Sequence, residues 1–290
     1  MRYRVRHETA YNYAEPVDLA AHILHLTPRA LPYQQIIAAS VGADPVPGRI
    51  TTGTDHFGNQ ASWLFIDKPH AHFDVILDAV VEVALPPPPP DDATQAWEDV
   101  ARMAAQAGGP SWRAAEFVFD SPLAPAVHAA RDYAAKSFTE ARPLLAALRD
   151  LNRRIRCDFV FRPGATAIAT PVATVLRQRA GVCQDFAHLM ISALRALGLP
   201  ARYISGYIRT RPPPGQSKRR GCDQSHAWVG AWLGPEHGWL DLDPTNDLIV
   251  SDEHVILGWG RDYADVSPVR GVLLGGGAHS LSVSVDLESE

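Results

Sequence analysis

Alternating apolar and polar residues predict that the chain begins with a β domain. In residues 73–85 every second side chain from Val75 to Leu85 is apolar, which is typical of a half-buried strand. Shorter patterns at 2–5, 21–26 and 63–66 predict further strands, and residues such as Gly53 and Gly58 mark turns between them. We therefore expect residues 1–85 to form an N-terminal β domain.

A run of five prolines, Pro86 to Pro90, ends this pattern. Proline has no amide donor and favours an extended polyproline conformation, so residues 86–93 are predicted to be a stiff linker. Beyond it, apolar residues recur at helical spacing in 94–107, 125–138 and 142–157. These segments predict helices at the start of a second domain, residues 94–290.

The longest helical pattern covers residues 182–197, where apolar side chains recur at three- and four-residue steps. Gly198 and Pro200 follow, in the positions that commonly end a helix. The period then changes to two, which predicts strands at 203–208, 225–233, 238–242 and 280–287. The sequence predicts an α+β domain, and the last strand could pair within it or return to the N-terminal sheet.

Composition limits the classes of function. The 290-residue chain has a formal net charge of −5, which argues against a broad nucleic-acid-binding surface. No stretch approaches the roughly 20 apolar residues of a membrane span, and no apolar segment follows the basic N-terminus as in a secretory signal. Three cysteines, Cys157, Cys183 and Cys222, are too few for a disulfide framework. We expect a cytoplasmic protein without nucleic-acid or membrane partners, and the basic run 218–220 is expected to be an exposed loop.

Cys183 is the candidate nucleophile, because it stands in the first turn of the helix predicted at 182–197. The first amides of a helix have no partner within it, and the helix N-terminus favours negative charge. Both effects favour a thiolate and would stabilise an oxyanion formed by its attack. By location alone, an inert buried cysteine is an equally good interpretation.

His226 and Asp243 supply the other two groups that a thiol nucleophile needs. His226 opens one predicted strand and Asp243 ends the next, across the short loop Gly234–Gly238. A hairpin with a four-residue loop makes Asp243 the diagonal neighbour of His226, and a two-residue loop places the two residues opposite each other. An Asp beside the base would hold the proton on Nδ1 and present Nε2 to the thiol.

Three other residues could have a role in the site or in the core. Asp241 is the rival carboxylate, but both hairpins place it nearer to Trp228. His188 lies five residues after Cys183 and points away from it on the helix, so we interpret it as structural. Cys157 lies beside an apolar stripe and is expected to be a small core residue.

The N-terminal domain is expected to shape substrate access or to mediate assembly rather than to catalyse. It contains no cysteine, and its histidines are scattered. His70 and His72 have the spacing of two ligands on a strand, but no third partner is evident from the sequence. We expect no metal and no cofactor.

Three ordered segments carry a family resemblance: Gly181-Val-Cys183-Gln-Asp-Phe-Ala, His226-Ala-Trp-Val, and Trp239-Leu-Asp-Leu-Asp243-Pro-Thr. Together they resemble the transglutaminase-like core, and more narrowly the bacterial transglutaminase-like cysteine proteases. The resemblance implies an α+β fold with a papain/transglutaminase-like core, in which a nucleophile helix packs on an antiparallel sheet after an N-terminal β region. It also implies that Cys183, His226 and Asp243 are catalytic.

The eukaryotic transglutaminases have a tryptophan that helps to hold the oxyanion, and it has no matching position here. Their calcium-ligand clusters also have no counterpart in this sequence. The expected reaction is acyl transfer from a peptide or protein amide through a thioester on Cys183. Hydrolysis by a peptidase or amidase is favoured over transfer to an amine by a transglutaminase, and a catalytically idle binding module is the third alternative.

Overall fold

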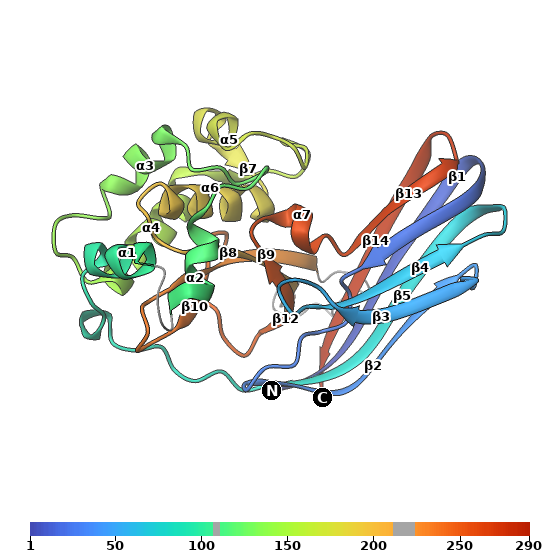
Figure 1. Ribbon diagram of the computed structural model, residues 1–290, viewed down its shortest axis with the longest axis horizontal. Coiled ribbons are helices and arrows are strands. Elements are labelled where there is room, and N and C mark those ends of the chain that lie inside the picture. Colours follow the sequence, from blue (N-terminus) through green and yellow to red (C-terminus); the bar gives the residue numbers. More distant parts are fainter. Residues whose placement is uncertain (107–110, 211–223) are drawn as a thin grey trace, which may run out of the picture.

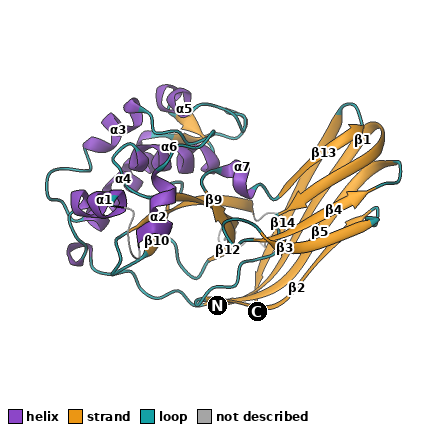
Figure 2. Cartoon of the chain, in the orientation of Figure 1, coloured by secondary structure: helices purple, strands orange, loops and turns teal. Residues whose placement is uncertain are grey.

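The computed structural model describes residues 1–106, 111–210 and 224–290, which form a helix-rich lobe beside an all-β lobe (Figures 1 and 2). The helices are η1 (Asp91–Ala93), α1 (Trp97–Ala105), α2 (Trp112–Ala115), η3 (Glu116–Val118), α3 (His128–Ala135), α4 (Leu144–Asp158), α5 (Val172–Gln178), α6 (Cys183–Arg195) and α7 (Tyr263–Val266). Within the described residues, no helix is both long and apolar enough to cross a membrane.

The all-β lobe is a seven-stranded sheet organised around one long strand. Its strands are β1 (Arg2–Leu24), β2 (Gln34–Asp44), β3 (Arg49–Thr54), β4 (Gln60–Ile66), β5 (His70–Val83), β13 (Val269–Gly275) and β14 (His279–Ser289). The first half of β1 lies between β5 and β14, and its second half lies between β4 and β13. Because β1 alternates buried and exposed positions over most of its length, one face of the sheet packs into a core.

The C-terminal strands belong to this N-terminal sheet. Residues 269–289 form the hairpin β13–β14, which pairs antiparallel with β1 along both of its halves. The tail that the sequence grouped with residues 94–290 therefore returns to the first lobe, and Figure 1 shows both chain ends beside that sheet. A sheet edge can accept a strand from anywhere in the chain, so local sequence did not decide this pairing.

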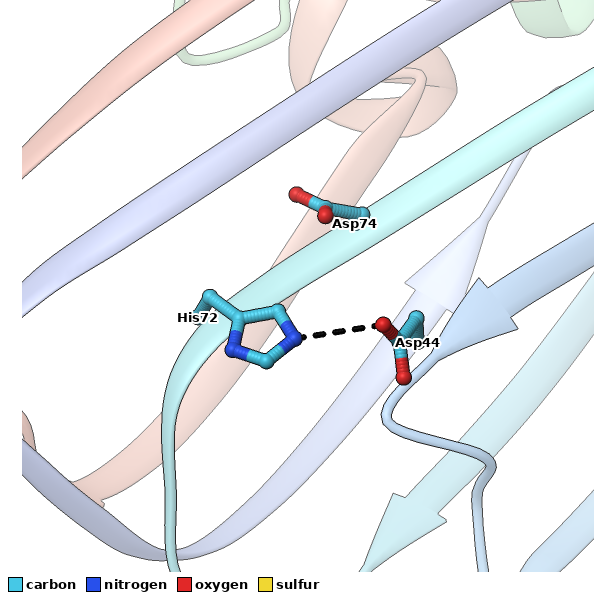
Figure 3. A group of neighbouring side chains, drawn as sticks. All are labelled: Asp44, His72 and Asp74. Carbon is cyan, nitrogen blue, oxygen red and sulfur yellow. Dashed lines mark hydrogen bonds and ion pairs between the residues drawn. The ribbon is translucent and has the colours of Figure 1, made fainter.

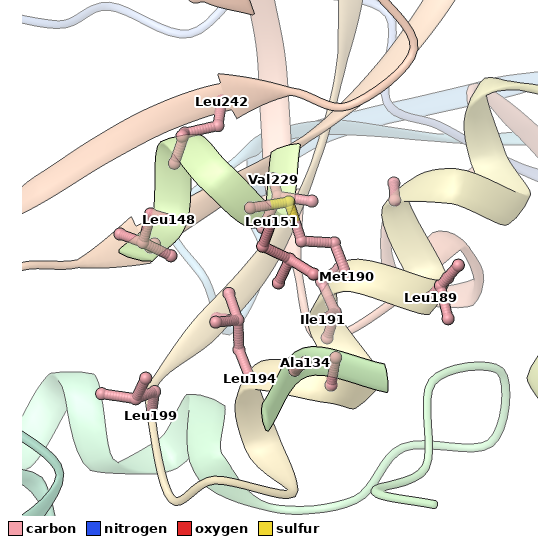
Figure 4. Close-up of a cluster of buried hydrophobic side chains, with 14 of the residues drawn as sticks. Ala134, Leu148, Leu151, Leu189, Met190, Ile191, Leu194, Leu199, Val229 and Leu242 are labelled. Carbon is pink, nitrogen blue, oxygen red and sulfur yellow. The ribbon is translucent and has the colours of Figure 1, made fainter. Parts of the chain in front are cut away.

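The helix-rich lobe confirms the predicted α+β architecture. Its antiparallel sheet has the strand order β11 (Leu248–Ile249), β10 (Trp239–Asp243), β9 (Gln224–Trp232), β8 (Ala201–Ile208), β12 (His254–Gly260). A short parallel pair, β6 (Val160–Phe161) and β7 (Ala180–Gly181), precedes α6. Helices α3, α4 and α5 and strands β8 and β9 pack around α6, which buries side chains on all its faces (Figure 4). The predicted amphipathic helix is therefore the central helix of the lobe.

Buried polar and apolar contacts fix the two lobes to each other. Gln34 of β2 has no exposed surface, and its side-chain amide donates to the carbonyl of Ile256 (2.7 Å) and accepts from the amide of Ile256 (2.8 Å). Tyr207, Val255 and Leu257 of the helix-rich lobe pack into the core of the seven-stranded sheet. The lobes thus share buried surface, and residues 84–90 join them without a helix or strand.

The structure describes Cys157 but not Cys222. Cys157 is exposed near the end of α4, so its interpretation as a core residue was wrong. The buried side of α4 is formed by residues such as Leu148, Leu151 and Ile155, and Cys157 follows the last of them by two positions, which turns it away from the core. Cys222 and the basic run 218–220 lie outside the described residues.

The contacts between the lobes predict that Gln34 contributes to the stability of the fold. Gln34→Ala should lower the free energy of unfolding by roughly 1–3 kcal/mol, because it leaves the buried N–H of Ile256 without an acceptor and removes one of the two donors to the carbonyl of Ile256, the other being the amide of Arg29. Gln35→Ala, at the exposed neighbouring position, is the matched control and should change stability by less than about 0.5 kcal/mol. Urea denaturation followed by circular dichroism measures both, and equal losses would show that the glutamine does not hold the lobes together.

Candidate active site

Local interactions start α6 at Cys183. Asp185 accepts the amide of Val182 (2.8 Å) and the hydroxyl of Thr166 (2.6 Å) through one carboxylate oxygen, which caps the chain just before the helix. A side chain at Gly181 would place a Cβ 2.7 Å from that same oxygen, so only glycine fits there. The half-buried Cys183 is the first helical residue, where its amide has no acceptor within the helix.

The hairpin β9–β10 has the register that a four-residue loop predicts. Trp239 pairs with Trp232 and Leu242 with Val229, and the amide of Leu233 donates to the carbonyl of Gly238 (2.7 Å). This register makes Asp243 the diagonal neighbour of His226. The structure accordingly brings the imidazole and the carboxylate together, with His226 Nε2 2.7 Å from Asp243 Oδ2.

The ring of His226 is turned opposite to the expectation. Asp243 holds Nε2, so Nδ1 is the nitrogen that remains for Cys183. The reason is geometric. Asp243 is the diagonal neighbour of His226, so its carboxylate lies at the far end of the imidazole, next to Nε2. The chemical roles of the two nitrogens are exchanged, and the division of labour between base and carboxylate is unchanged.

Asp243 is fully buried and is satisfied by a set of donors. Oδ1 accepts the amides of Thr245 (2.9 Å) and Asn246 (3.2 Å), and Oδ2 accepts His226 and the side-chain amide of Asn246 (2.7 Å). His254 Nε2 lies 3.7 Å from Oδ2, beyond hydrogen-bond distance but close enough to add positive potential. Burial opposes ionisation, yet these donors and the charge of His226 hold the pKa of Asp243 well below its ordinary value.

Sequence reasoning missed Asn246 and His254. A signal for Asn246 existed, because an Asp followed by Pro-Thr-Asn favours a turn in which the Asp side chain caps the next amides. His254 had none, since it reaches Asp243 from β12, on the far side of the sheet order.

The electrostatics of His226 favour its protonated form. Burial would lower the pKa of this ring, but the hydrogen bond to Asp243, the nearby Cys183 and both negative charges outweigh burial and raise the pKa to about 10. Cys183 is thus close enough to stabilise an imidazolium. A protonated His226 beside the thiol, held by a buried carboxylate, is what this geometry favours.

Asp241 belongs to a different environment. Its carboxylate accepts the indole N–H of Trp228 (3.4 Å) and faces the buried guanidinium of Arg202 (3.7 Å). Arg202 in turn stacks on Trp239 and Trp259, at 4.4 and 3.8 Å from the ring centroids. Asp241 therefore neutralises a buried cation.

His188 is buried among α6, β8 and α7. Its Nε2 accepts the amide of Tyr263 (3.2 Å), and its ring lies 5.0 Å from that of Tyr203. Burial lowers the pKa of His188 to about 4, so the ring is neutral at physiological pH. These contacts give it a packing role.

Of the two histidines considered as metal ligands, His72 has further possible ligand atoms nearby. His72, Asp44 and Asp74 offer ligand atoms within 4.8 Å of one another (Figure 3). His70 is buried and donates to the carbonyl of Lys68. His72 Nε2 already pairs with Asp44 Oδ2 at 3.2 Å. The group has three protein ligands on an exposed strand pair, one fewer than a closed structural zinc site uses.

Two pockets adjoin Cys183 and His226. One pocket, of about 570 Å³, lies between the lobes, and the second, of about 1040 Å³, is lined by residues such as Phe159, Arg209 and Asn246. Both pockets are lined by Cys183 and His226. Space therefore adjoins the thiol and the imidazole in two pockets.

Comparison with known proteins agrees with this geometry. Residues 3–82 match the bacterial transglutaminase-like N-terminal region, and residues 129–244 match the transglutaminase-like superfamily. An uncharacterized protein of Mycobacterium tuberculosis, Rv2569c, is 43% identical over 99% of this chain and 92% of its own length. The chain belongs to the transglutaminase-like superfamily. The matched core includes Cys183, His226 and Asp243.

Two further proteins are similar to this chain. A crystal structure from Cytophaga hutchinsonii, provisionally assigned as a cysteine protease, superposes with a TM-score of 0.76 at 21% identity and covers 99% of this chain and 90% of that one. This likeness shows that the two-lobed fold is shared. A protein-glutamine gamma-glutamyltransferase of Pseudomonas aeruginosa is 32% identical over 42% of this chain and 18% of its own length.

The two carboxylates should respond differently to mutation. Asp243→Asn should lower the alkylation rate of Cys183 near pH 7 by at least about tenfold, because it removes the charge that stabilises the imidazolium; the same change in a serine triad costs about 10⁴ in turnover. Asp241→Asn should leave that rate within about twofold and lower stability, since Arg202 loses its partner. Stopped-time labelling with peptide mapping measures the rates, and the reverse ranking would assign the orienting role to Asp241.

The raised pKa of His226 makes one contribution to stability pH-dependent. Because the folded-state pKa is about 10 and the ordinary value is 6.5, protonation of the ring stabilises the fold fully below pH 6.5 and ceases to do so as the pH rises to 10. The stability gap between wild type and His226→Gln should therefore shrink, by up to a few kcal/mol, between pH 6.5 and 10. Chemical denaturation across this range measures the gap, and a constant gap would contradict the ion pair.

Proposed function

We propose that the protein is a cysteine peptidase or amidase that cleaves an amide through a thioester on Cys183. The observation that carries this proposal is the buried His226–Asp243 pair beside a thiol at the N-terminus of a helix, with pockets on both sides. A nucleophile, a base, a carboxylate that orients the base and room for substrate are the parts that acyl transfer requires.

In the first step, the Cys183 thiolate attacks the carbonyl carbon and the carbon–oxygen double bond becomes an oxyanion. The free amide of Cys183 is placed to donate to this oxygen. His226, protonated through its pair with Asp243, gives its Nδ1 proton to the departing amine as the carbon–nitrogen bond breaks. The products are a free amine and a thioester.

In the second step, water replaces the amine. Formation of the thioester removes the thiolate charge, and with it part of the interaction that raises the pKa of His226. The neutral ring can then take a proton from water, whose oxygen attacks the thioester and releases a carboxylic acid and the thiolate. Asp243 keeps Nε2 protonated throughout.

Transfer to an amine is the second candidate, because the core is 32% identical over 122 residues to a protein-glutamine gamma-glutamyltransferase. The chemistry is the same up to the thioester, and the acceptor alone differs. Incubation with glutamine peptides and a biotinylated primary amine separates the two: hydrolysis releases ammonia without label, whereas transamidation attaches biotin. Cys183→Ala is the control for both products.

The proposed mechanism requires a selectively reactive thiol. At pH 7, iodoacetamide should label Cys183 at least about tenfold faster than Cys157, because an ordinary cysteine is only a few per cent thiolate at this pH. Cys157 is a strict internal control, since it is exposed while Cys183 is half-buried. Brief labelling and peptide mapping give both rates. Faster labelling of Cys157 would point to the idle binding module instead.

A search for the acyl intermediate tests the function directly. Cell extract is incubated with the protein, the reaction is quenched in acid, and the peptide that carries Cys183 is examined by mass spectrometry for added acyl groups. A hydrolase that acts on a component of the extract leaves thioesters on Cys183, and their mass identifies the acyl group. His226→Gln is the control, because it should lose these adducts.

A further inference from the structure

The all-β lobe forms one wall of the pocket at Cys183. The wall consists of three cross-strand pairs, in which residues of β1 stand directly opposite residues of β14: His7 with Val285, Thr9 with Val283, and Tyr11 with Leu281. All six side chains line the same 570 Å³ pocket as Cys183, Gln184 and His226. We call these six residues the sheet wall.

The residues of the sheet wall become more exposed to solvent from the pair His7–Val285, at the floor of the pocket, to the pair Tyr11–Leu281, at its mouth. His7 and Val285 are 1% exposed, whereas Val283 and Leu281 are 51% and 53% exposed. His7 is fixed in the floor by hydrogen bonds to Tyr207 and Thr9, both 2.8 Å. Two large aliphatic residues that line the pocket thus expose about half of their surface to solvent, although burying them would be favourable.

The apolar pattern of β14 is confined to the side that faces the pocket. From 280 to 285 the strand reads Ser-Leu-Ser-Val-Ser-Val, so serines occupy one face and aliphatic residues the other. Val285 continues this apolar face into the core of the sheet, whereas Leu281 and Val283 on the same face remain half exposed beside the pocket. The pocket side of β14 is therefore apolar and open to a ligand.

Away from Cys183 and His226, the described lining of this pocket carries no charged side chain. Its described residues include no Asp, Glu, Lys or Arg, and the other polar groups are hydroxyls, the amide of Gln184 and the ring of His7. Burial lowers the pKa of His7 to about 4, so the floor is neutral at physiological pH. A charged side chain entering here would lose water without gaining a partner.

We propose that the sheet wall is the specificity subsite of the enzyme and binds an uncharged, apolar side chain of the amide substrate next to the bond that Cys183 attacks. This inference rests on the proposed function for the identity of the substrate as an amide. It gives the all-β lobe a direct part in substrate selection, since Leu281, Val283 and Tyr11 would contact that side chain. A pocket of 570 Å³ lies in the size range of small-ligand sites.

The test compares two alkylating reagents that differ by one apolar group, iodoacetamide and N-benzyl-iodoacetamide. Their rates at Cys183 are divided by their rates with glutathione to remove intrinsic reactivity. Wild type should prefer the benzyl reagent by about tenfold or more, and Val283→Asp should abolish this preference, which is the ratio of the two normalised rates within each variant. Val283→Thr keeps the shape with less apolar surface and should give an intermediate preference.

Val272→Asp is the matched control, because Val272 is 77% exposed on β13 of the same sheet and is absent from the pocket lining. It should retain the full preference. No benzyl preference in wild type, or an equal loss in Val272→Asp and Val283→Asp, overturns the subsite. Circular dichroism establishes that each variant is folded.

A binding measurement separates failure of the subsite from failure of the proposed chemistry. N-acetyl-leucine benzylamide and N-acetyl-glutamate benzylamide are titrated into Cys183→Ala protein, with binding followed by nuclear magnetic resonance. The leucine compound should bind at least about tenfold tighter, and adding Val283→Asp should remove the difference. Slow iodoacetamide labelling of wild type together with this selectivity refutes the thioester mechanism and supports the subsite. Equal binding of the two compounds overturns the subsite even if Cys183 is reactive.

Discussion

The burial of one carboxylate determines how the rest of the site is built. Asp243 has no exposed surface, and an ionised carboxylate in that position costs several kcal/mol unless it is paired and hydrogen-bonded. Its partners come from three places in the chain: His226 on β9, Asn246 after β10 and His254 on β12. Satisfying Asp243 therefore requires the strands of the second sheet to be in register, and that register in turn fixes the imidazole relative to α6 and Cys183. A site of this kind is preorganised by the same interactions that stabilise the sheet.

Cys183 is positioned by separate and more local interactions. Gly181 and Asp185 define where α6 begins, and the burial of α6 on all sides prevents the helix from shifting along its axis. The thiol and the imidazole are thus supported independently, one by a central helix and one by a hairpin, and they meet where these elements converge. Negative charge alone does not identify the carboxylate that orients His226. Asp241 lies on the same strand as Asp243, but its carboxylate pairs with Arg202.

The two lobes together make a site that neither could make alone. The pocket between them takes Cys183 and His226 from the helix-rich lobe and a neutral, partly apolar surface from β1 and β14. Gln34 and the aromatic and aliphatic residues packed around Tyr207 hold the lobes in one arrangement, so this surface is fixed relative to the thiol. Superfamily membership accounts for the shared core, and the hairpin that returns to β1 supplies one wall of the pocket at Cys183.

The sequence by itself determined the features that depend on spacing within a short segment. These are the place of Cys183 at the start of α6, the parity that puts His226 and Asp243 on one face, and the α+β order of the second lobe, because helical and strand periods are local properties. Tertiary structure alone decided which ring nitrogen faces Asp243, the contribution of His254, the exposure of Cys157 and the return of β13 and β14 to β1. Each of these depends on contacts between segments far apart in the chain, and hydrophobic burial and strand pairing select such contacts only when the whole fold is assembled.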